Sequence, residues 1–136
     1  MKEELKGPTV EDVAVAIVKE KGENDIDVFN AYLVNYKEET IEGVFVTTRG
    51  YGVNRTTSKE VKTSKLRHFL DVVQGKTFKK IEPIMEDVFG LSNEFWVSFF
   101  LNNKMYDKKY IFLPETINES NLRKIDLIEK QGIIII

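Results

Sequence analysis

The chain has 136 residues, of which 42% are hydrophobic and 31% are charged, and this composition is typical of one folded domain rather than a disordered chain. Its 20 lysines and arginines almost balance its 22 aspartates and glutamates, which argues against a protein dedicated to nucleic acids or membrane surfaces. It has no cysteine, and no apolar run reaches the roughly 20 residues that a membrane-spanning helix needs, so we expect a cytoplasmic protein without a membrane contact.

The first apolar segment, residues 9–21, is compatible with a helix or with a strand. Thr9 is a suitable N-cap for a helix that carries Val13 and Ile17 on one face. Val13, Val15 and Ile17 also alternate as they would in a strand, and β-branched side chains lose rotamer freedom in a helix. We therefore predict a strand here and keep the helix as the alternative.

Six further segments are rich in β-branched and aromatic residues and are separated by turn residues, which is the pattern of strands in an antiparallel protein. Asn102 and Asn103 favour a tight hairpin turn between the last two of them, because asparagine tolerates positive φ. Pro83 and Pro114 are expected to end the strands that precede them. The six predicted strands span residues 28–35, 41–48, 66–73, 77–81, 94–101 and 105–113.

About seven short strands with almost no helix predict an all-β domain, a β-sandwich with a small barrel as the alternative. The single domain is expected to cover residues 1–136, with a polar N-terminal lead at residues 1–8. Residues 115–136 are predicted to be a C-terminal extension that packs on or beside the sheet. Its last four residues, all isoleucine, would be a sticky edge if left free, so we expect them to pair within the domain.

Two stretches resemble parts of bacterial immunoglobulin-like domains. Residues 32–46 are similar to a strand pair in which the first strand ends in asparagine, turns through charged residues and returns as an apolar strand. Residues 72–78 look like the glycine-containing corner that precedes a later core strand in those domains. The resemblance implies a sandwich of the immunoglobulin-like type.

Most of the chain also resembles a family of short bacterial proteins, some of which carry the label phenylalanyl-tRNA synthetase alpha subunit. That activity is not implied here, because a class II synthetase binds ATP between two motif arginines on a catalytic sheet. The chain shows no such pair, and 136 residues are too few for a complete core of that kind. The resemblance is carried by residues 29–35, 62–68, 93–99 and 106–112.

Few residues offer catalytic or metal chemistry. One histidine, His68, and no cysteine cannot build a zinc site of the usual kind, and no metal or cofactor is expected. His68 is predicted to share a strand face with Leu66, Leu70 and Val72. Carboxylates gather over Glu82–Asp87 and could form an acid–base pair, although a solvated loop is the favoured interpretation. An enzyme with a site near His68 or Glu82–Asp87 is therefore an alternative, and no catalytic residue is assigned.

A basic stretch runs from Arg49 to Lys80, with nine basic residues, two acidic residues and interleaved aromatic rings. Such a surface could bind single-stranded RNA by charge and stacking, with Arg67, Lys79 and Lys80 as its residues. Strand alternation would instead divide these charges between two faces, and that solvated arrangement is favoured.

Residues 95–100 carry large rings on both faces of one predicted strand, because Phe95 and Phe99 alternate with Trp96 and Phe100. One pair can line the core, and the other must be covered by a terminal segment or by a partner. We therefore predict a non-catalytic binding or assembly module that contacts a protein partner or forms a homodimer. Its contact residues would be Trp96 and Phe100, with Tyr32, Ile134 and Ile136 as weaker candidates.

Overall fold

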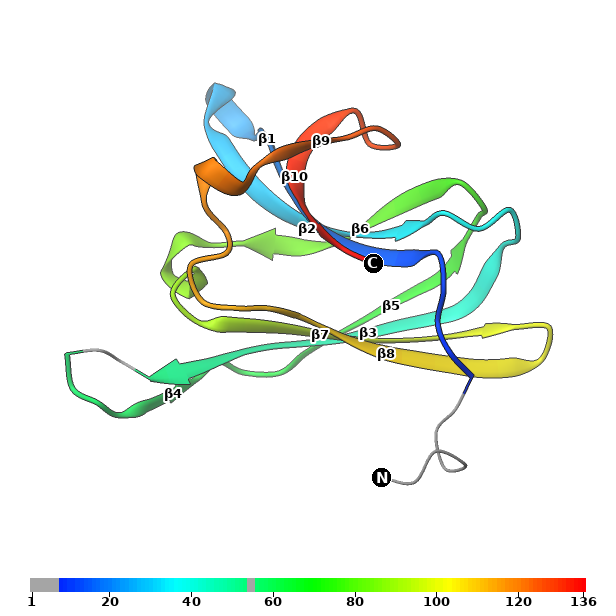
Figure 1. Ribbon diagram of the computed structural model, residues 1–136, viewed down its shortest axis with the longest axis horizontal. Helices are drawn as coiled ribbons and strands as arrows, with labels where there is room; N and C mark the ends of the chain where they lie inside the picture. Colours follow the sequence, from blue (N-terminus) through cyan, green and yellow to red (C-terminus); the bar gives the residue numbers. More distant parts are fainter. Residues whose placement is uncertain (1–7, 54–55) are drawn as a thin grey trace.

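The computed structural model describes residues 8–53 and 56–136, and within them ten strands form two antiparallel sheets that pack as a β-sandwich (Figure 1). This confirms the predicted all-β sandwich, and the sheets do not close into the alternative barrel. The immunoglobulin-like type and the family resemblance stay predictions. All but the last residue of the polar lead, and Arg55 of the basic stretch, lie outside the described residues.

Sheet A is built around β1, which pairs with β2 on one side and with β10 on the other. Residues 13–21 are therefore a strand, as predicted, and not a helix. Every residue from Val13 to Val18 is buried, because both faces of this central strand are covered. A strand buried on both faces has no polar alternation, which is why its sequence also fits a helix. The order is β6 (Thr77–Ile84), β2 (Asp27–Asn35), β1 (Val13–Lys21), β10 (Lys130–Ile135) and β9 (Arg123–Ile125).

Sheet B is built around β3 (Ile41–Val53), which pairs along one edge with β7 (Ser92–Leu101) and then β8 (Lys104–Phe112). Its other edge pairs first with β5 (Leu66–Val73) and then with β4 (Glu60–Lys62), a strand that we expected to be loop.

The prediction that β3 ends near residue 48 is wrong, because the strand continues through two glycines to Val53. These glycines do not form a turn; they let neighbouring residues pack close to the strand backbone. A Cβ on Gly52 would lie only 3.0 Å from a methyl carbon of Leu91, and one on Gly50 would lie 3.1 Å from Thr63.

The β5–β6 hairpin crosses from sheet B to sheet A at one side of the sandwich (Figure 1). The buried side chain of Asn35 joins its turn to the preceding β2–β3 turn, because its amide donates to the carbonyls of Glu39, Val73 and Gln74. Gly75 permits the close approach of the two turns, since a Cβ there would overlap the Glu38 carbonyl. The asparagine at the end of β2 therefore holds this side of the sandwich together.

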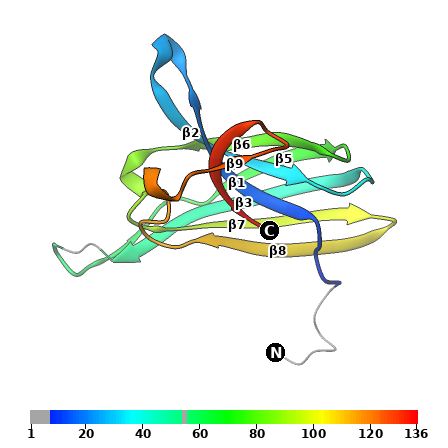
Figure 2. The same cartoon turned by 45° about the horizontal axis from the view of Figure 1, so that its top comes forward.

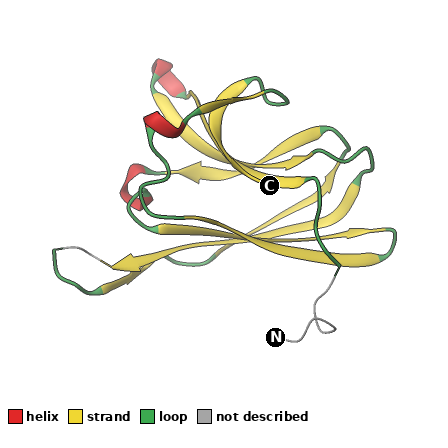
Figure 3. Ribbon diagram, viewed as in Figure 1, coloured by secondary structure: helices red, strands yellow, loops and turns green. Residues whose placement is uncertain are grey.

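Three short 3-10 turns, drawn in red in Figure 3, complete the described structure. They are η2 (Glu23–Asp25), η3 (Glu86–Val88) and η4 (Glu119–Asn121). The core lies between the sheets and is formed by the inward side chains of β1, β2, β3, β5, β6, β7 and β8. Its largest members are Phe95, Phe99, Tyr110 and Phe112.

The C-terminal segment covers the side of sheet A that faces away from sheet B (Figures 1 and 2). Ile125 and Ile128 pack there against Ala14, Ala16 and Val18 of β1. Ile133, Ile134 and Ile135 pair with β1 in antiparallel register, so the prediction that the tail pairs within its own chain is confirmed for these three residues, whereas Ile136 lies beyond β10 and is 63% exposed. This segment therefore buries a second apolar layer on sheet A and leaves sheet B without an equivalent cover.

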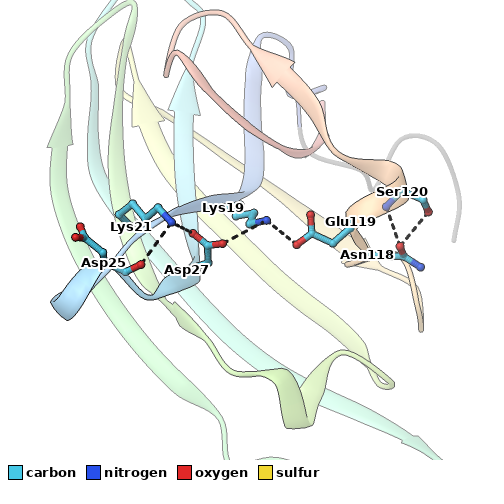
Figure 4. Close-up of polar contacts among 7 residues, drawn as sticks. All are labelled: Lys19, Lys21, Asp25, Asp27, Asn118, Glu119 and Ser120. Atoms are coloured by element: carbon cyan, nitrogen blue, oxygen red, sulfur yellow. Dashed lines mark hydrogen bonds and ion pairs between the residues drawn. The ribbon is translucent and has the colours of Figure 1, made fainter.

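An exposed ion-pair network ties the C-terminal segment to β1 (Figure 4). Lys19 lies 2.7 Å from Glu119 of η4 and 3.6 Å from Asp27 of β2, and Lys21 lies 2.7 Å from the same aspartate. The hydrogen bond to Glu119 is the main cause that raises the pKa of Lys19. Asn118 caps η4 by accepting the Ser120 backbone N–H. Exposed pairs of this kind contribute little stability, so we assign the network a role in orientation.

Candidate functional site

The outer face of sheet B carries five of the thirteen large apolar side chains that are exposed in the described part of the chain. Alternation along β7 buries Phe95, Val97 and Phe99 and turns Trp96 and Phe100 outward, each of them 46% exposed. The neighbouring strands add three more apolar side chains to the same face. We call the set the aromatic face; it consists of Phe69 (64% exposed), Trp96, Phe100, Met105 (55%) and Ile111 (37%).

Strand register brings these side chains together across four strands. Phe100 lies directly opposite Met105, and Ile111 lies opposite the residue two positions before Trp96. On the other side of β7, Phe69 pairs with Phe45 of β3, which in turn pairs with β7. The sequence pattern predicted Trp96 and Phe100 as a contact pair, and the fold sets both on one continuous sheet surface.

A bulge in β3 shapes the end of this face. Gly43 has φ +55°, in the left-handed region that favours glycine, and a Cβ there would lie 3.1 Å from the Phe100 ring. The ring therefore lies over the bare backbone of the bulge. Gly43 both permits the bulge and makes room for Phe100.

The Trp96 indole is held in place by two oppositely charged neighbours on β8. Its ring nitrogen donates to Asp107 over 3.1 Å, and the ammonium of Lys109 lies 4.7 Å from its ring centroid. Such a cation–π contact is worth roughly 0.5–1 kcal/mol at an exposed site. The orientation of the Trp96 ring is therefore fixed by contacts within the chain itself.

Charges on the outer face of sheet B cancel. Arg49 and the buried Glu94 lie opposite each other and pair over 3.1 Å, with the Arg49 guanidinium also over the Tyr51 ring. Strands β3, β5, β7 and β8 place three cations and three anions at outward positions, so the face has no predominant sign. They are Arg49, Arg67 and Lys109 against Glu42, Glu94 and Asp107.

The three weaker contact candidates do not lie on the aromatic face. Tyr32 is on the outer face of sheet A, where its hydroxyl donates to Glu20 over 2.7 Å. Burial and that hydrogen bond raise the pKa of Tyr32 to about 12. Ile134 packs partly buried on the same side, and Ile136 is 63% exposed at the end of the chain. Tyr32 and Ile134 therefore already have intramolecular roles.

The residues named for RNA binding are also separated. Arg67 is on the outer face of sheet B, whereas Lys80 lies opposite Tyr32 on sheet A. Lys79 turns its ammonium toward β5, where it donates to the Leu70 carbonyl over 2.6 Å. An RNA strand would have to pass from one sheet to the other to meet all three.

His68 points inward, but the predicted face that it shares with Val72 is wrong. Asp71 has φ +64° at a bulge in β5, and this extra residue shifts the alternation by one position. Leu70 and Val73 are therefore buried, and Val72 is 41% exposed.

His68 joins the two sheets where the β5–β6 hairpin separates. Its Nε2 lies 2.7 Å from Glu82 Oε1, and the same oxygen accepts the Thr48 hydroxyl over 2.6 Å. Glu82 lies within β6, and its side chain is only 15% exposed. Its assignment to a solvated loop is therefore wrong. The trio comes from three strands far apart in sequence, and no spacing rule would have grouped it.

Beside this trio lies a pocket of about 310 Å³. We call it the seam pocket, because it lies where β5 and β6 diverge into different sheets. Its lining includes the polar residues Thr48, Arg49, Glu82, Asp87 and Glu94 and the apolar residues Leu66, Ile84, Met85, Val88 and Phe95.

No group of three or more His, Asp or Glu side chains in residues 8–53 and 56–136 could hold a metal ion. In the same part of the chain, no helix is long and apolar enough to cross a membrane. Comparison with protein-family models, with curated proteins and with solved structures found no match. A functional assignment therefore depends on the two surfaces described above.

Proposed function

We propose that this protein is a non-catalytic assembly module that docks through its aromatic face onto the aromatic face of a second copy. The observation that carries the proposal is the gathering of five large apolar side chains, each between 37% and 64% exposed, on a sheet face that the C-terminal segment does not cover. Large contiguous apolar patches on a folded protein usually mark contact sites.

The exposed apolar area is close to what a stable interface uses. A large side chain presents roughly 150–250 Å² when fully exposed, so these five together present about 500 Å². A standard interface buries about 800 Å² on each partner, of which about 60% is non-polar. The aromatic face therefore supplies about the apolar area that one side of such an interface needs.

Shape and charge favour a second copy as the occupant. A flat sheet face is best matched by another sheet face, and two sheets pack about 10 Å apart with interdigitating side chains. In a two-fold interface each face meets itself, so a face of one predominant sign would repel its partner. The three cations and three anions of this face avoid that repulsion.

The same charge balance gives less support to RNA binding. Nucleic acid affinity depends on a surplus of lysine and arginine that neutralises phosphates. Arg49 is paired with Glu94, and Lys109 lies over Trp96 with Asp107 beside it. The aromatic rings are therefore accompanied by neutral pairs instead of a basic surplus.

Sedimentation velocity over a range of protein concentrations tests the proposal. The wild type is expected to approach twice its monomer mass of 15.8 kDa as the concentration rises. Phe69→Lys is expected to remain monomeric, because it places a charge on the β5 side of both aromatic faces, and the wild-type side chain is 64% exposed and contributes little to the fold.

The matched control is Ile26→Lys, which changes an equally exposed side chain (62%) at the far end of the β1–β2 hairpin. This variant is expected to dimerise as the wild type does. A wild type that stays monomeric at every concentration, or a dimer that Phe69→Lys leaves intact, would overturn the proposal.

A further inference from the structure

The seam pocket is independent of the aromatic face and has the features of a small-molecule site. It opens where β5 and β6, the two strands of one hairpin, enter different sheets. In the described part of the chain, the two strands therefore do not pair with each other beside the pocket. Its volume of about 310 Å³ is at the small end of the usual range for ligand sites, about 300–1,000 Å³. A small metabolite would fit a pocket of this size.

Glu82 is the polar group that is best placed to bind a ligand in this pocket. Its side chain is only 15% exposed, and its Oε1 already accepts hydrogen bonds from His68 and Thr48. Its second oxygen, Oε2, has no hydrogen-bond partner among the described residues, although the side chain lines the pocket. No fully buried side-chain oxygen lacks a partner in the described residues, so Oε2 reaches the solvent of the pocket, where a carboxylate oxygen favours a cationic donor.

The remaining charges of the pocket also favour a cation. Two acidic residues, Glu82 and Asp87, line it beside the Arg49–Glu94 ion pair, whose side chains lie at outward positions of sheet B. Arg49 is already paired with Glu94 over 3.1 Å, which leaves the other two carboxylates without a lysine or arginine from the lining. The excess negative charge lies beside apolar lining from Leu66, Met85 and other residues.

We propose that the seam pocket binds a small organic cation, a protonated amine or guanidinium with a short apolar body, whose charged head donates to Glu82 Oε2. His68 and Thr48 act as positioning residues, because their bonds to Oε1 fix the carboxylate and direct its free oxygen. The apolar body of the ligand contacts Leu66, Ile84 and Met85.

An NMR titration of the ¹⁵N-labelled protein with hexylammonium tests this site, and hexanoate serves as the anion with an equally long alkyl chain. Hexylammonium is expected to give saturable amide shifts at Gly50, Leu66 and Asn93, which lie around the pocket, while hexanoate leaves them unchanged. Glu82→Gln is expected to weaken binding about tenfold or more, since it removes a charge-assisted hydrogen bond.

Glu86→Gln is the matched control, because this neighbouring exposed glutamate does not line the pocket, and it is expected to bind as the wild type does. Two results with the wild type would each overturn the proposal. One is that hexanoate binds as tightly as hexylammonium, and the other is that hexylammonium gives no saturable shift. An unchanged affinity in Glu82→Gln would do the same. Dimerisation is measured separately, so failure of this site leaves the aromatic face untouched.

Discussion

The ammonium of Lys109 lies 4.7 Å from the centroid of the Trp96 ring, and the register of β7 and β8 places the two residues directly opposite each other. The same indole donates to Asp107, which lies two residues before Lys109 on β8, so two charged side chains of one strand hold the indole. Trp96 is the only tryptophan in the chain and is 46% exposed. Its fluorescence therefore reports directly on the aromatic face.

Tryptophan emission is expected to shift to shorter wavelength as the protein concentration rises, because docking removes water from the half-exposed indole. The shift should be absent in Phe69→Lys and present in the control Ile26→Lys. Emission that does not depend on concentration in the wild type would contradict docking on this face. A shift that persists in Phe69→Lys would place the interface elsewhere.

Gly43→Ala is expected to destabilise the fold by about 1–2 kcal/mol, because an alanine is strained in the left-handed region. Its Cβ would also lie 3.1 Å from the Phe100 ring, so the ring must move and dimerisation should weaken. Urea unfolding and sedimentation measure the two effects. Gly90→Ala is the control, since its Cβ would meet only Glu115 at an ordinary 3.6 Å; equal losses in both variants would contradict this account of Gly43.

Stability should fall in acid through Glu20, whose side chain is 9% exposed and accepts hydrogen bonds from Asn30, Tyr32 and Lys130. Burial alone would raise the pKa of Glu20, but the hydrogen bonds from Lys130, Tyr32 and Asn30 together hold it below the ordinary value of 4.5. A group whose pKa is lowered on folding stabilises the protein above its unfolded pKa, and this contribution is lost as the pH falls through the folded pKa.

Glu20→Gln is therefore expected to cost about 1–2 kcal/mol at neutral pH and progressively less as the pH falls below about 4.5. Thermal unfolding across this pH range measures the difference. The control Glu39→Gln changes an exposed glutamate and should follow the wild-type curve. A constant difference between Glu20→Gln and wild type at all pH values would show that the charge of Glu20 has no part in the effect.

Asn35→Ala is expected to destabilise the sandwich by about 2–3 kcal/mol, since it leaves the buried carbonyls of the β2–β3 and β5–β6 turns without their donor. Urea unfolding measures this loss. Asn121→Ala removes one exposed hydrogen bond to the Thr116 carbonyl and should cost less than about 1 kcal/mol. Similar losses in the two variants would argue against the joining role of Asn35.

Strand positions could be predicted wherever one face is buried and the other exposed. Strand β7 is the clearest case, because the alternation of Phe95 and Phe99 with Trp96 and Phe100 predicted both the core and the exposed rings. Alternation does not distinguish strand from helix for β1, which is buried on both faces. The extension of β3 through its glycines could not be predicted either, since nothing local shows that Gly52 packs against Leu91 instead of turning.

The candidate sites were predicted only in part, for a related reason. Met105 and Ile111 follow from the hairpin register set by the Asn102–Asn103 turn, so that signal was present in the sequence. The bulge at Asp71 was not, and one inserted residue was enough to misplace Val72. The trio Thr48, His68 and Glu82 depends on how three distant strands meet, which residue spacing does not encode.

The most direct test of the proposed docking is an isotope-filtered NOE experiment on a mixture of labelled and unlabelled protein. Docking of two aromatic faces predicts intermolecular NOEs that connect the rings of Phe69, Trp96 and Phe100 in one copy with Met105 or Ile111 in the other. Intermolecular NOEs that map instead to β9 and β10, or none at concentrations where the wild type should be dimeric, would contradict it.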